Sequence, residues 1–122
     1  MKGRKGNSEM VVLMTASSEK EAARIATALL EKRLIACANL VPRIRSLYRW
    51  KGKLCDDAET LLLCKTRRDL FGSLEKEAKR LHSYEVPEII GLAVAEGSAP
   101  YLAWLRSETR TQPVKGRTRR TC

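Results

Sequence analysis

The sequence contains few aromatic residues, no long apolar run and one histidine, and each shortage excludes a class of protein. Aromatic side chains make up 5% of the 122 residues, so the hydrophobic core must be mainly aliphatic. No apolar segment approaches the ~20 residues that a membrane-spanning helix needs. The basic N-terminal segment lacks the apolar run of a secretory signal peptide. We therefore expect a soluble, cytoplasmic protein with no membrane partner.

Motifs that carry common enzyme chemistry are also missing. The sequence contains no GxxxxGK phosphate-binding loop, no nucleophile elbow and no HExxH zinc motif. Because His82 is the single histidine, histidine-based acid–base catalysis has one candidate only. The four cysteines are not closely paired along the chain, which favours free thiols over a disulfide framework. We therefore expect a protein that is not an enzyme.

The charge is strongly positive but unevenly placed. Lysine and arginine number 24 against 14 acidic residues, which gives a net charge of +10. More than half of this excess lies in two polar ends, 1–9 and 111–122. We predict that both ends are disordered, the second as a basic tail, and that 10–110 forms one domain. With one phenylalanine and no aromatic RNA-binding signature, the domain is not expected to bind a specific nucleic acid.

Hydrophobic periodicity divides this domain into four strands and three helices. Ser18 and Glu21 form a capping box before a helix whose apolar residues repeat at i, i+3 and i+4. Pro42 predicts a bulge, because proline cannot donate to a strand ladder. The expected elements are strand 10–14, a helix ending near Arg33, strand 34–40 extended past Pro42 to Trp50, strand 53–65, a helix opened by Thr66 and Asp69, strand 88–94, and a short helix capped by Ser98.

This order predicts an α+β, ferredoxin-like β-α-β-β-α-β fold with a short C-terminal helix. Two helices would cover one sheet face and leave the other open. The hairpin around Lys51-Gly52 is long, since eight residues of strand span ~27 Å. An isolated two-stranded ribbon is marginally stable in water. We therefore predict an oligomer whose interface includes the apolar ribbon residues Ile44, Leu47, Tyr48 and Trp50.

Several motifs resemble, in order, those of one protein family. They are VVLMTA at 11–16, ACAN at 36–39, YRWKGKL at 48–54, CKT at 64–66, HSYEVPE at 82–88 and the terminal YLAW at 101–104. Together they resemble the CutA family of divalent-cation tolerance proteins over about residues 10–107. The resemblance implies a homotrimer similar to the PII signalling proteins, a role in metal-ion response and copper binding. Mammalian relatives are linked to acetylcholinesterase processing or anchoring.

Two positions depart from the family pattern. The family loop usually reads HPYEVP, whereas this chain has Ser83 in place of the first proline, which removes a constraint on the loop. Some bacterial relatives carry cysteine where this chain has Met14. A thioether is soft but uncharged, so a Cys-Cys-His copper site would be altered here.

Cys37 and His82 are the candidate metal ligands, because a thiolate and an imidazole suit copper or zinc. Both residues also have a structural interpretation that needs no metal. In it, Cys37 is a small buried strand residue and His82 makes a local hydrogen bond at the end of a helix. We therefore expect weak copper binding and no obligatory cofactor. Two ligands do not complete a site, so further donors would come from a neighbouring subunit or from Met14, Glu59, Tyr84 or Glu85.

An alternative function is a PII-like signalling or scaffold module. It would bind a small anion or a partner protein in clefts between subunits. Lys65, Arg67 and Glu59 would be its natural lining. The full set of expected cleft-lining residues is Met14, Glu59, Lys65, Tyr84 and Glu85.

Overall fold

The computed structural model describes residues 9–111. All of the tail predicted at 111–122 except Thr111 lies outside the described residues, and so does the N-terminal segment before Glu9. Glu9 itself, predicted to be disordered, is buried and begins the first strand. The elements are β1 (Glu9–Ala16), α1 (Glu19–Glu31), β2 (Cys37–Trp50), β3 (Lys53–Arg67), α2 (Phe71–Leu81), β4 (Ile89–Ala93) and α3 (Ala99–Glu108).

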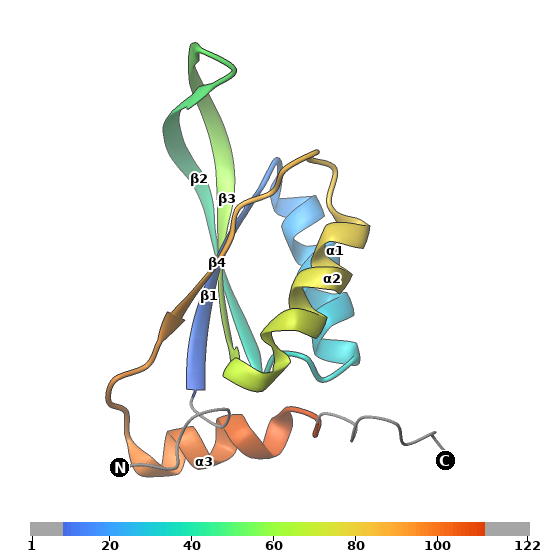
Figure 1. Cartoon of the computed structure of the whole chain (residues 1–122), viewed down its shortest axis with the longest axis vertical. Helices are drawn as coiled ribbons and strands as arrows, with labels where there is room; N and C mark the ends of the chain where they lie inside the picture. The colour runs from blue at the N-terminus through green and yellow to red at the C-terminus, as the bar shows by residue number, and fades with distance from the viewer. Residues whose placement is uncertain (1–8, 112–122) are drawn as a thin grey trace.

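The four strands form one antiparallel sheet in the order β2-β3-β1-β4, with α1 and α2 on one face (Figure 1). This is the ferredoxin-like α+β arrangement that the sequence predicts. Alternate residues of β1, namely Val12, Met14 and Ala16, point towards the helices and are fully buried. Ile25 and Leu29 of α1 pack into the same aliphatic core.

Some element boundaries differ from those predicted. The second strand starts at Cys37 rather than at Leu34, which lies buried in the preceding loop. Thr66 does not open a helix but belongs to β3, where its Oγ1 donates to the carbonyl oxygen of Leu34 at 2.6 Å. A single 3-10 turn then precedes α2. Ser98 occupies the N-cap of α3, but its side chain makes no capping hydrogen bond.

The hairpin is long because β2 and β3 extend beyond the rest of the sheet (Figure 1). The last residue of β1 pairs with Thr60, so the part of β3 before Thr60 pairs with β2 alone. Lys51 and Gly52 form the turn with φ of 50° and 80°, as two-residue hairpin turns require. The predicted bulge at Pro42 is confirmed by a register shift between Val41 and Ile44.

Helix α3 lies across the end of the sheet opposite the hairpin tip (Figure 1). It buries Leu105 and places Arg106 in an ion pair with Glu9 of β1. After α3, the amide of Arg110 donates to the carbonyl oxygen of Arg33 at 2.8 Å. Within residues 9–111, no helix is long and apolar enough to cross a membrane.

Candidate functional site

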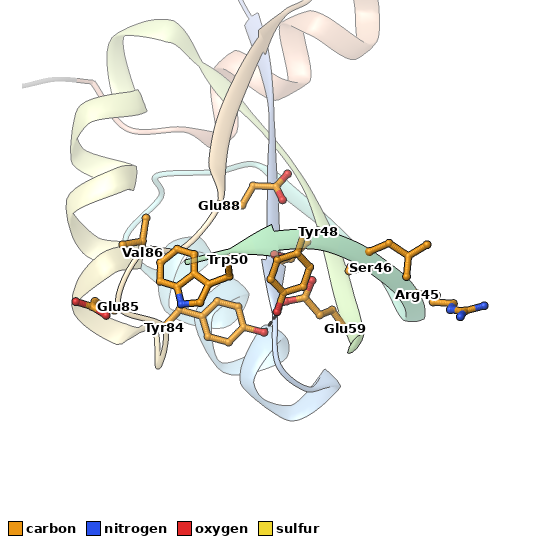
Figure 2. A pocket seen from close by; sticks show the side chains of 11 residues that line it. Arg45, Ser46, Tyr48, Trp50, Glu59, Tyr84, Glu85, Val86 and Glu88 are labelled. Atoms are coloured by element: carbon orange, nitrogen blue, oxygen red, sulfur yellow. Dashed lines mark hydrogen bonds between the residues drawn. The ribbon is translucent and has the colours of Figure 1, made fainter. Parts of the chain in front are cut away.

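A cleft of about 720 Å³ separates the β2–β3 hairpin from the loop that leads into β4 (Figure 2). Aromatic and acidic side chains dominate the lining. The hairpin contributes Tyr48 and Trp50, because β2 residues two apart project to the same face. Further functional groups that line the cleft include Arg45 of β2, Glu59 of β3, and Tyr84, Glu85 and Glu88 of the loop.

A carboxylate–phenol pair lies in the cleft. The Tyr84 hydroxyl donates to Glu59 Oε2 at 2.5 Å. Glu59 is 8% exposed. Burial and the hydrogen bond to Glu59 raise the pKa of Tyr84, so its phenol remains a donor at neutral pH. Tyr48 similarly donates to Asp57, and that hydrogen bond raises the pKa of Tyr48.

The loop that carries Tyr84 is held by the buried carboxylate of Glu21. Glu21 Oε1 accepts from the Ser17 hydroxyl at 2.7 Å, and Oε2 accepts from the Ser83 amide at 2.7 Å. Burial opposes ionisation of Glu21, but the hydrogen bonds outweigh it and lower its pKa from 4.5 to about 2. The Ser83 amide is a donor that proline lacks. The departure from the family pattern therefore adds a hydrogen bond, and the loop is anchored instead of being less constrained.

The side chain of His82 is buried beside the end of β1, and both of its ring nitrogens have partners. Nε2 lies 2.7 Å from the carbonyl oxygen of Thr15, and the Tyr84 amide donates to Nδ1 at 3.1 Å. A carbonyl only accepts, so Nε2 donates the hydrogen bond to Thr15. Neither nitrogen offers a free lone pair to a metal in this conformation.

Cys37 lies at the other end of the sheet, and one chain does not bring it to His82. Cys37 is half-buried on the edge strand β2. It pairs with Lys65 of β3, and Lys65 in turn pairs with Val11 of β1. Thr15, which contacts His82, lies four residues further along β1, or about 13 Å away. Among residues 9–111, no group of three His, Cys, Asp or Glu side chains could hold a metal ion.

The other predicted site residues fall into three groups. Glu59, Tyr84 and Glu85 line the cleft, as expected. Met14 does not, because strand alternation turns it into the core. Lys65 Nζ instead lies 3.9 Å from Cys37 Sγ and also contacts Asn39, while Arg67 pairs with Asp69.

The predicted interface residues also divide. Ile44, Tyr48 and Trp50 share one face of the ribbon, and Leu47 belongs to the other. Tyr48 and Trp50 line the cleft within one chain, and so does Leu47 from the other face. Glu88 also lines the cleft but was not predicted as a site residue, although its place directly after the YEVP segment indicated it.

The fold and the extended hairpin define a small ferredoxin-like protein whose candidate site lies beside the hairpin. A family model described as CutA1 divalent ion tolerance protein matches residues 10–108. The chain therefore belongs to the CutA1 divalent ion tolerance protein family, which confirms the predicted family.

Individual relatives agree with this assignment. The "Divalent-cation tolerance protein CutA" of Thermus thermophilus is 52% identical over 101 residues, which cover 83% of this chain and 98% of the relative. Human "Protein CutA" is 46% identical over 98 residues. The match covers 80% of this chain and 55% of the human protein, so it spans about half of that relative. The crystal structure of CutA1 from Oryza sativa superposes with a TM-score of 0.84 at 38% identity, covering 88% of this chain and 100% of that one.

The Glu21 anchor predicts a defined pH dependence of stability. Because the pKa of Glu21 is lowered in the folded state, its contribution is present above pH 4.5 and is lost as the pH falls towards 2. Glu21→Gln should reduce the free energy of unfolding by about 1–3 kcal/mol at pH 7. Chemical denaturation should show that this deficit shrinks between pH 4.5 and 2. A deficit that stays constant with pH would contradict the role of the charge.

Proposed function

We propose that this chain is a non-enzymatic, homotrimeric protein of divalent-cation tolerance that binds copper weakly through Cys37. The observation that carries the copper part is the position of this thiol. The Cys37 thiol is half-buried on the edge strand β2. Its partner in register, Lys65, lies on the sheet face away from the helices, so Cys37 lies on that face too. A thiolate is a soft ligand that suits copper. The cytoplasmic location stays a prediction.

The surroundings of Cys37 support weak rather than tight binding. The Lys65 ammonium, 3.9 Å from the sulfur, repels a metal cation at the same place. His82 must first leave Thr15 and Tyr84 before it ligates. We therefore assign Cys37 the larger contribution and His82 a smaller one, supplied after its loop opens or by a neighbouring subunit.

Copper binding should depend on Cys37 more than on His82. We expect Cys37→Ser to weaken Cu(I) binding at least about tenfold, equivalent to about 1.4 kcal/mol. His82→Asn should have a smaller effect. Anaerobic titration against a chromophoric chelator measures both. Cys55→Ser removes another half-buried thiol, in the hairpin, and serves as the control. Unchanged binding by the Cys37→Ser variant would show that the site is elsewhere.

The proposed trimer is supported by apolar side chains that one chain leaves uncovered. Leu47 and Leu54 lie on the ribbon face opposite Tyr48 and Trp50 and are 68% and 79% exposed, although Leu47 also lines the cleft. Ile90 and Leu92 of the edge strand β4 are half exposed. Exposed apolar groups on a ribbon that is marginal alone favour contact with further copies of the chain.

Disrupting the outer ribbon face should dissociate the trimer. Sedimentation of the unaltered protein should give the mass of three chains of 13.7 kDa. The Leu47→Glu, Leu54→Glu double variant should shift to a smaller species, because buried unpaired carboxylates are costly. Leu30→Glu introduces the same charge at an exposed leucine of α1 and should leave the mass unchanged. A monomeric unaltered protein would contradict the proposal.

The cleft favours a second function, that of a PII-like module which binds a small ligand. Its volume of about 720 Å³ is within the range of small-molecule sites. The lining contains convergent polar groups on aromatic walls, as such sites commonly do.

A further inference from the structure

The charge of the cleft is opposite to that expected for an anion site. Three carboxylates line it, those of Glu59, Glu85 and Glu88. The one cationic lining residue, Arg45, is paired with Asp56 through two hydrogen bonds of 3.0 and 2.7 Å. Figure 2 shows its guanidinium directed away from the aromatic residues. The cleft therefore attracts a cation and repels an anion.

Glu59 is a buried carboxylate that lacks a cationic partner. It is more than nine-tenths buried, and none of the ion pairs within residues 9–111 includes it. The Tyr84 hydroxyl supplies one hydrogen bond but no positive charge. Buried carboxylates are normally paired with a cation. In Figure 2 the side chain of Glu59 lies beside Tyr48 and Tyr84.

The aromatic walls suit the same kind of ligand. Trp50 and Tyr84 lie close together in the cleft, with Tyr48 next to Glu59 (Figure 2). Aromatic faces attract ammonium and guanidinium groups, and tryptophan does so best. The Trp50 ring already has a cation nearby, because Lys51 Nζ lies 5.7 Å from its centroid. Lys51 itself is outside the cleft lining.

We infer that the cleft binds a small organic cation with an alkylammonium or alkylguanidinium group. The charged head pairs with Glu59, and the alkyl part packs against Trp50 and Tyr84. This inference rests on the second proposed function, ligand binding in the cleft, and adds the chemical class of the ligand. An inorganic cation such as Ca²⁺ fits less well, because it needs six to eight oxygen ligands.

Fluorescence of Trp50 offers a direct measurement. The chain has two tryptophans, and Trp104 lies on α3, at the far end of the sheet from the hairpin tip. In a full-length Trp104→Phe background, titration with butylammonium and with butylguanidinium should change the signal saturably. The apparent affinity should fall as the salt concentration rises. Butanol, a neutral analogue of similar length, should give no saturable change.

A matched pair of charge variants tests the role of Glu59. Glu59→Gln keeps an acceptor for Tyr84 and removes the charge, so it should weaken binding of both cations at least tenfold. Glu108→Gln removes the same charge at the exposed end of α3 and should leave the affinity unchanged. Thermal unfolding checks that each variant is folded. If Glu59→Gln does not fold, Trp50→Leu in the exposed ribbon should weaken binding as followed by NMR.

Four results would overturn the inference. These are no saturable response to either cation, equal affinity in Glu59→Gln, equal binding of butanol, and binding seen only after Leu54→Glu, a change outside the cleft lining. The last result would show that a neighbouring subunit fills the cleft.

Parallel titrations with citrate and adenosine triphosphate separate the two proposals. An anion response without a cation response rejects the ligand class alone, whereas no response to any probe also rejects ligand binding in the cleft.

Discussion

The Glu21 carboxylate accepts a hydrogen bond from Ser83, 62 residues further along the chain, and the candidate site depends on that contact. One oxygen accepts from the turn before α1, and the other accepts from the loop after α2. Because these hydrogen bonds outweigh the cost of burial, the carboxylate stays charged and holds the loop. His82 is thereby placed against Thr15, and Tyr84 reaches Glu59.

The hairpin provides the second wall of the site, and a local irregularity shapes it. The register shift between Val41 and Ile44 includes Arg43 with φ of 61°, in the left-handed region. Such bulges bend the strand and increase its twist. Beyond the bulge, Tyr48 and Trp50 line the cleft opposite the Glu21-anchored loop. The cleft thus needs both a twisted ribbon and an anchored loop.

Local signals predicted most elements correctly, and contacts between distant segments account for the errors. The Ser18 capping hydrogen bond and the Lys51-Gly52 turn involve neighbouring residues only, so the sequence shows them directly. Thr66 carries a helix-start signal, yet its hydroxyl bonds to Leu34, 32 residues away, and stays in β3. In the site, Lys65 was expected beside Glu59, but the two lie six positions apart along β3, or about 20 Å.

The sequence by itself determined the order of elements, the aliphatic core and the family, because periodicity and ordered motifs are properties of short segments. The tertiary structure decided which functional groups meet. It separated Cys37 from His82, buried Met14 and brought Glu59 to Tyr84 and Trp50. The physical reason is that sheet register and loop closure set distances between remote residues, and no local propensity encodes either. For the same reason, the acidic character of the cleft emerges only in the folded chain.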